Sequence, residues 1–133
     1  MALGFDNTTR TAWLQVIIDD IDAGAGAGLI NIYSGTRPAT GGPSGTLLAQ
    51  LTCSNPSSAS NTGGVLTLDT IASDTNANAT GTASWFRVTD STGAFVLDGD
   101  VGTSGSDLNL NDTAITTGDT VSITSFTITA PNA

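Results

Sequence analysis

Beyond residue 28, the apolar residues of this chain fall into short runs with a period of two, and clusters of turn-forming residues separate the runs. This alternation places apolar side chains on one face of a strand, and short strands divided by Gly, Pro, Asn and Asp clusters are typical of all-β domains. The pattern therefore predicts an all-β fold, an antiparallel β-sandwich or jelly roll. The expected strands cover residues 29–33, 47–53, 65–69, 71–73, 83–89, 94–100, 108–110 and 120–130.

The segments between these runs give the expected connections. The expected loops are the polar or Gly/Pro-rich segments 34–45, 55–64 and 74–81. The clearest hairpin pairs residues 83–89 with 94–100, because Asp90 and Gly93 occupy the first and fourth positions of a type I turn. In the last strand the apolar residues change sides, which indicates either a bulge near Thr124–Ser125 or burial on both faces.

Only the first 22 residues have a helical pattern. An apolar stripe with 3.6-residue spacing is formed by Trp13, Leu14, Ile17, Ile18 and Ile21. We expect Trp13 to pack this helix against the sheet, and we expect Asn7 or Thr8 to cap its start. The two aspartates that follow Ile18 would lie near the negative end of the helix dipole. The helix is therefore expected to stop near Ile18, unless a cationic group lies nearby.

The length of 133 residues is that of one domain, with a helical segment at 1–22 and the β-sandwich at 29–130. Its composition restricts the chemistry, because three Arg and twelve Asp are its only charged residues and the net charge is −9. With no His and no Lys, an imidazole base, a Schiff-base lysine and a P-loop lysine are excluded. Scattered cations argue against nucleic-acid binding. We expect a protein that is not an enzyme.

No apolar run approaches the roughly 20 residues that cross a bilayer, so no membrane partner is expected. The N-terminus has no basic segment followed by a long apolar run, and we therefore expect a soluble product that is made in the cytoplasm. Cys53 is the only cysteine and lies in an alternating segment. It is expected to fill a core position, since free cysteine behaves as a small apolar residue.

Two short Asp-x-Asp patterns are the candidates for chemistry. Asp98 and Asp100 share one face of a strand, as a paired-carboxylate site would require. Asp20 and Asp22 begin a D-x-D-x-G pattern that resembles the start of a calcium loop, but the remaining acids of that loop are missing. We interpret both pairs as solvated turn acids. The sequence therefore predicts no catalytic residue, no cofactor and no metal ligand.

A candidate interface is carried by the segment with the second tryptophan. Trp85 and Arg87 share one strand face, while Phe86 and Val88 share the other, so one pair is expected in the core. The other pair can form a binding patch, because Trp and Arg are enriched at interface hot spots. The alternative is that Trp85 covers the edge of the core and Arg87 pairs with an Asp. Arg37, in the first Gly/Pro-rich loop, completes the predicted interface.

Several segments resemble small β-rich proteins from the structural modules of tailed bacteriophages. They are LINIYSG (29–35), GTASWFRV (81–88), LDGDVGTSG (97–105), DLNL (107–110) and VSITSFT (121–127). The resemblance implies a non-enzymatic virion protein, first of all a capsid decoration (cement) protein with a sandwich or jelly-roll fold on the capsid exterior. Its implied partners are the major capsid protein and further copies of itself in a homotrimer.

The composition of the strand edges also favours a protein that associates with neighbours. Isolated β proteins commonly guard their edge strands with lysine or other charges, and this chain has no lysine. We therefore expect neighbouring subunits or a host surface to cover the edges. The alternative function is a tail- or fibre-associated adhesion or carbohydrate-binding module, in which an exposed tryptophan would contact a saccharide.

Overall fold

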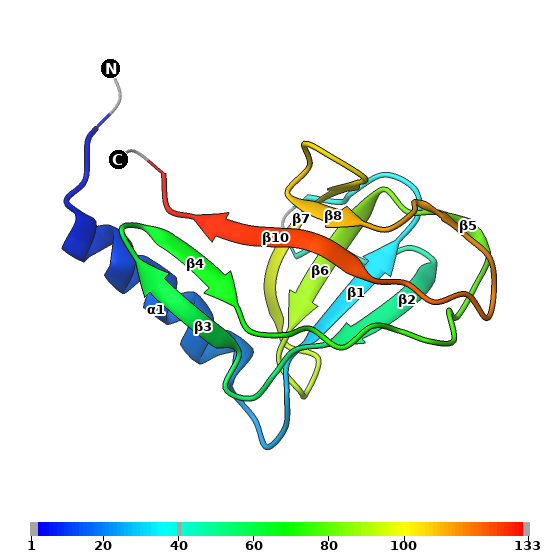
Figure 1. Cartoon of the computed structure of the whole chain (residues 1–133), viewed down its shortest axis with the longest axis horizontal. Helices are drawn as coiled ribbons and strands as arrows, with labels where there is room; N and C mark the ends of the chain where they lie inside the picture. Colours follow the sequence, from blue (N-terminus) through cyan, green and yellow to red (C-terminus); the bar gives the residue numbers. More distant parts are fainter. Residues whose placement is uncertain (1–2, 40, 132–133) are drawn as a thin grey trace.

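The computed structural model describes residues 3–39 and 41–131, and Figure 1 shows one helix beside a strongly curled sheet. The elements in chain order are α1 (Asn7–Ile21), β1 (Leu29–Tyr33), β2 (Leu47–Thr52), β3 (Ser58–Thr62), β4 (Val65–Leu68), β5 (Gly81–Thr82), β6 (Trp85–Thr89), β7 (Phe95–Gly102), β8 (Leu108–Leu110), β9 (Ala114–Ile115) and β10 (Ile123–Thr129). The expectation of a mostly β protein with one N-terminal helix is confirmed.

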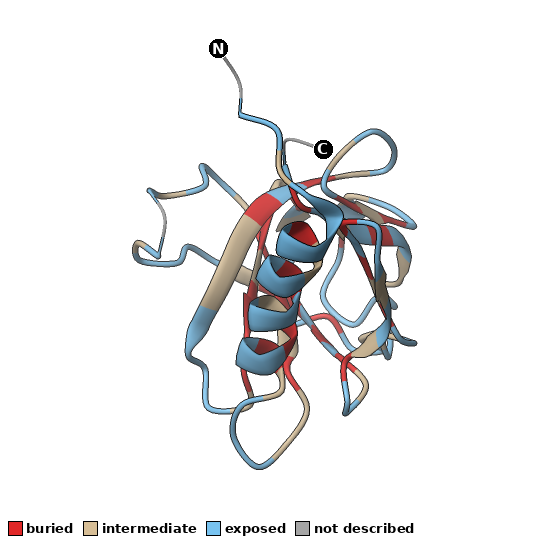
Figure 2. Ribbon diagram, turned by 90° about the vertical axis from the view of Figure 1, so that its left-hand side faces the viewer, coloured by how far each residue is buried: buried red, intermediate tan, exposed pale blue. Residues whose placement is uncertain are grey.

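Eight of the described strands form one curled sheet in the order β2-β1-β6-β7-β8-β10-β4-β3, and β5 and β9 form a separate pair. Neighbouring strands are antiparallel except β7 and β8, which run parallel. The sheet curls far enough for Phe86 of β6 to meet Phe126 of β10, with the ring centroids 5.2 Å apart. The apolar core lies inside this curl. One side of the core is covered by α1, which contacts β3, β4, β6 and β7 (Figure 2).

A glycine in the middle of β7 makes room for a phenylalanine ring of the core. Gly99 is the register partner of Phe86, and a Cβ at Gly99 would lie 2.5 Å from Cε1 of that ring. Only glycine therefore allows the ring to lie against the neighbouring backbone. The interpretation of Asp98 and Asp100 as turn acids is wrong, because β7 continues without a break to Gly102.

The helix begins and ends differently from the prediction. Its N-cap is Asp6, whose side chain accepts a hydrogen bond from the backbone N–H of Thr8 at 2.9 Å. It continues through the two aspartates to Ile21 with no basic residue in its last turn. Burial of Leu14, Ile18 and Ile21 in the core explains this end, because packing outweighs a dipole penalty of at most about 1 kcal/mol at an exposed position.

The prediction that Trp13 packs in the core is wrong, since Trp13 is 40% exposed. Each residue turns a helix by about 100°, so Trp13 lies on the flank of the stripe centred on Leu14 and Ile18. The curled sheet covers the centre of the stripe only. Val16, on the same flank, is exposed as well.

Two strand predictions also need correction. Segment 55–64, expected to be a loop, contains β3, whose polar sequence SASNT has no apolar period. Its pairing with β4 is set by Gly63 and Gly64, which both have positive φ, 61° and 76°, as a two-residue hairpin turn requires. Segment 71–73, expected to be a strand, makes only an isolated bridge between Thr52 and Ala72.

Two other features of the sheet follow the prediction closely. The hairpin of β6 and β7 has the expected turn, in which Gly93 has a φ of 90°. A register shift between Ile123 and Ser125 confirms the expected bulge in β10.

Cys53 is buried, as predicted. The pair that β5 forms with β9 was not predicted, because strands of two residues leave no periodic signal.

One buried cation joins the helix to the far end of the chain. Arg10 is buried, its Nη2 donates to the carbonyl of Ala130 at 2.7 Å, and its Nη1 donates to the carbonyl of Gly63 at 3.2 Å. Nη1 also donates to Oδ1 of Asn7 at 3.2 Å. The guanidinium lies so close to Gly64 that a Cβ there would be 2.4 Å from Cζ. Carbonyl oxygens thus hold this cation, and through it they fix the position of α1.

We predict that Arg10→Ala lowers the free energy of unfolding by about 2–4 kcal/mol, because it leaves buried carbonyl groups without donors and opens a gap under α1. Arg37→Ala is the matched control, since it removes an exposed arginine with an exposed ion pair, which contributes at most about 1 kcal/mol. Urea unfolding of both variants measures the difference. Equal losses in the two variants would show that Arg10 does not fix the helix.

Candidate functional site

The predicted interface residues belong to the outer face of β2, β1, β6 and β7, the face turned away from the core. The register aligns two rows across this face: Asn31, Arg87 and Asp98 in one, and Tyr33, Trp85 and Asp100 in the next. Since side chains alternate along a strand, these rows point outward while Phe86 and Val88 point into the core. The expectation that one of the two pairs lies in the core is confirmed, and the structure shows that this pair is Phe86 and Val88.

The outer face is covered in part by residues 34–39 and 41–46, which lie between β1 and β2. Nε1 of Trp85 donates to the carbonyl of Ser34 at 3.2 Å, and Nη2 of Arg87 donates to the carbonyl of Gly42 at 2.7 Å. The Trp85 ring stacks on Tyr33, with centroids 4.4 Å apart. Trp85 is consequently only 1% exposed, so a partner would reach it only if this segment moved away.

Arg87 is held by a two-pronged ion pair. Its Nε lies 2.7 Å from Oδ1 of Asp98, and its Nη2 lies 2.9 Å from Oδ2. The guanidinium also lies over the rings of Trp85 and Phe95, 5.3 and 5.2 Å from their centroids. The hydrogen bond to Asp98 raises the pKa of Arg87 above its ordinary value, although burial acts in the opposite direction. The alternative expectation, that Arg87 pairs with an Asp, is the arrangement observed.

Arg37 is the one member of the predicted interface that is well exposed. Its Nε lies 3.3 Å from Oδ1 of Asp100, and both side chains are largely in solvent. Such an exposed pair is weak and easily exchanged for another partner. The structure thus places Trp85 and Arg87 inside the protein and Arg37 on its surface, and contact between Arg37 and a partner stays a prediction.

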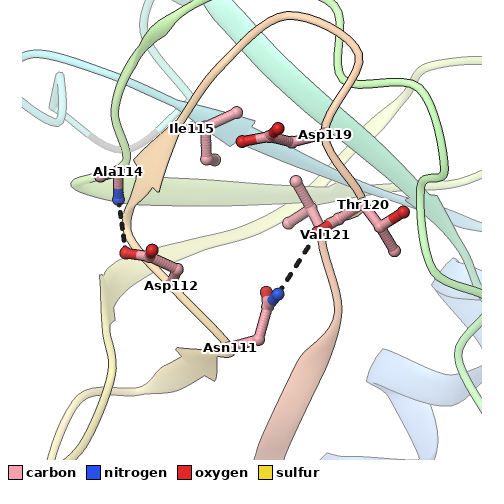
Figure 3. Close-up of a pocket in the computed structure, with 7 residues that line it drawn as sticks. All are labelled: Asn111, Asp112, Ala114, Ile115, Asp119, Thr120 and Val121. Carbon is pink, nitrogen blue, oxygen red and sulfur yellow. Dashed lines mark hydrogen bonds between the residues drawn. The ribbon is translucent and has the colours of Figure 1, made fainter.

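The hollow drawn in Figure 3, about 250 Å³ in volume, contains two carboxylates that were not singled out from the sequence. Oδ1 of Asp112 accepts from the backbone N–H of Ala114, and Oδ2 of Asp119 accepts from that of Thr116, both at 2.9 Å. The side chain of Asn111 donates to the carbonyl of Thr120 at 3.3 Å. These groups close local turns, and this role accounts for their presence.

The remaining Asp-x-Asp pattern is also part of the framework. Both carboxylate oxygens of Asp22 accept from the backbone N–H of Ser57, at 2.9 and 3.3 Å. This contact ties the end of α1 to the start of β3. Within residues 3–39 and 41–131, no group of three or more Cys or Asp side chains is arranged to hold a metal ion.

The largest exposed apolar side chains near one another lie beside the helix, and the sequence analysis did not select them. Trp13 and Val16 are 40% and 57% exposed. Phe5 packs against Trp13, with ring centroids 4.7 Å apart and planes at 59°. We call these three residues, Phe5, Trp13 and Val16, the α1 outer face. The position of Val16 outside the buried stripe was the available signal, because it widens the apolar arc beyond what a sheet covers.

Comparisons of the chain with protein-family models, with curated proteins and with solved structures found no match. In the part of the chain that the structure describes, no helix has the length and apolarity that crossing a membrane requires.

We predict that Asp98→Asn lowers the free energy of unfolding by about 2–4 kcal/mol, because it leaves the Arg87 cation largely buried without its counter-charge. The double variant Asp98→Asn, Arg87→Met is expected to be more stable than Asp98→Asn alone, since the unpaired cation is gone. Asp100→Asn, at the exposed pair, serves as the control and should cost at most about 1 kcal/mol. Denaturant unfolding of these variants measures the differences. If Arg87→Met lowered the free energy of unfolding of Asp98→Asn still further, the pairing would be refuted.

A pH dependence follows from Cys53. Burial raises the pKa of this thiol from its ordinary 9.0 to about 11, and the nearby Asp22 carboxylate adds to the effect. The folded protein therefore holds the proton more tightly than the unfolded chain does. This stabilisation is fully present below pH 9 and is lost as the pH rises toward and through 11.

We predict that between pH 8 and pH 11 the wild type loses about 2 kcal/mol more unfolding free energy than Cys53→Ala, in which the thiol is absent. Urea unfolding at the two pH values gives the difference. Identical losses in both proteins would mean that the thiol is not protected by the fold.

Proposed function

We propose that this chain is a non-enzymatic structural protein of a phage virion, and that within the virion it is a capsid decoration protein. It binds the major capsid protein on the capsid exterior and associates with further copies of itself as a homotrimer. The resemblance of five of its segments to phage structural proteins supports this assignment. So does the chemistry of the described carboxylates discussed above, which accept backbone hydrogen bonds or pair with arginine.

The observation that carries the proposal is that the described residues leave an apolar face and a strand edge of the protomer uncovered. The α1 outer face is apolar and uncovered, and the sheet ends at β3, whose outer edge makes no backbone hydrogen bond to another described segment. The opposite edge, β2, is instead covered by the chain itself: Ala72 bridges to Thr52, and Asn78 donates to the carbonyl of Leu48. One neutral edge, beside α1, thus has no strand partner among the described residues, and we infer that a neighbouring subunit covers it.

We also propose that the curled sheet is a form of the β-sandwich or jelly roll. The contact between Phe86 and Phe126 supports this, because the two rings come from β6 and β10, which are not neighbours in the sheet. Two parts of one sheet therefore face each other across a shared core, as the layers of a sandwich do.

The proposal predicts saturable binding of the purified protein to capsid shells assembled without it. Co-sedimentation should give a fixed ratio of this chain to the major capsid protein, and calorimetry should show the decorated shell melting at a higher temperature than the bare shell. Light scattering should give a mass three times the 13.3 kDa of the chain. A monomer that leaves the shells undecorated would overturn the proposal, and a positive glycan-binding screen would favour the adhesion module instead.

A further inference from the structure

The α1 outer face is a continuous apolar surface on a well-anchored element. Trp13 and Val16 are three residues apart and therefore adjacent on the helix, and Phe5 folds back onto Trp13 from the segment that precedes it. Figure 2 shows exposed residues along the side of α1 that is directed away from the sheet. Below it, Leu14 and Ile18 are buried in the core and Arg10 holds the first turn. A partner would meet a preformed surface.

The charges around this face are all negative. Asp6 at the start of the helix and Asp19 and Asp20 near its end are exposed. The last two add to the negative end of the helix dipole, which strengthens the local potential. No ion pair to any of the three is formed by the described residues.

The cations that could neutralise these acids are committed elsewhere. Arg10 is buried under the helix and donates to carbonyl groups, and Arg87 is paired with Asp98. Arg37 is paired with Asp100 on the other face of the sheet. The chain has no further arginine and no lysine, so the positive charge that complements this face must come from another molecule.

We propose that the α1 outer face is a docking site for an apolar groove bordered by Lys or Arg side chains on a partner protein. The inference rests on the proposed function, in which that partner is the capsid shell. An amphipathic helix that lays its apolar flank into a groove is a common mode of recognition, with anchors at positions three and four residues apart. Trp13 is the main anchor, and Asp19 and Asp20 contact the basic border.

A second copy of this chain fits the face less well. Each copy carries a net charge of −9, and a contact between two α1 outer faces would bring six carboxylates together without an arginine or lysine. An anionic lipid surface is disfavoured by the same charges.

The test is binding to purified shells assembled without this protein, measured as Kd by co-sedimentation at several salt concentrations. Trp13→Ala is expected to weaken binding at least about tenfold, as the loss of a central aromatic anchor does. The double variant Asp19→Asn, Asp20→Asn is expected to weaken binding severalfold and to flatten its salt dependence. Phe95→Ala is the matched control, because Phe95 is also an aromatic residue with 40% exposure but lies at the start of β7; it should change Kd less than about twofold.

The possible outcomes separate the two proposals. If the wild type does not bind the shells, the proposed function fails, and this inference fails with it. If the wild type binds and Trp13→Ala and the double Asp variant bind equally well, the docking face is wrong while the proposed function stands. Thermal melting of each variant shows whether a loss of binding comes from a lost contact or from unfolding. The conservative variant Trp13→Phe should retain both the fold and most of the binding.

Two further measurements decide which kind of molecule binds to the α1 outer face. Concentration-dependent self-association that disappears in Trp13→Ala would assign the face to a second copy and overturn the proposal. Binding to vesicles of phosphatidylcholine and phosphatidylglycerol that disappears in the same variant would assign it to lipid, with the same consequence. Monomer–oligomer behaviour and vesicle binding that are unchanged by Trp13→Ala are the expected results.

Discussion

The ring of Phe86 determines how the sheet of this protein can curl. It lies against the backbone of Gly99 on the neighbouring strand and meets Phe126 from the other part of the sheet edge-on. Strands of three to eight residues cannot enclose a core while they stay flat, so the sheet has to bring its two parts together around large side chains. A glycine opposite the ring and a second ring beyond it meet that requirement.

The few arginines serve mainly to hold this arrangement together. Arg10 links α1 to the β3–β4 turn and to the end of β10, and Arg87 links β6 to β7 and to the segment at Gly42. Because two of the three cations are used inside the fold, the exposed aspartates dominate the charge of the surface. The internal structure thereby produces the negative character that a basic partner would recognise.

The placement of the two tryptophans changes which surface is the candidate site. Trp85 lies on the outer face of the sheet and would be exposed there, but it donates to the carbonyl of Ser34 in the segment that follows β1, and Tyr33 stacks on it. Trp13 has the spacing of a core residue, and the curl of the sheet leaves it uncovered. Both assignments depend on what lies above each ring, and contacts between segments distant in the sequence decide that.

The sequence by itself determined the elements whose residues carry a local signal: the N-terminal helix, the β6–β7 hairpin with its glycine turn, and the bulge in β10. These depend on the period of apolar residues and on turn chemistry, which act within a few positions. Only the tertiary structure decided that α1 runs on to Ile21 and that Trp85 is enclosed on the outer face of the sheet. In each of these cases the free energy comes from packing against a distant segment, and neighbouring residues carry no trace of it.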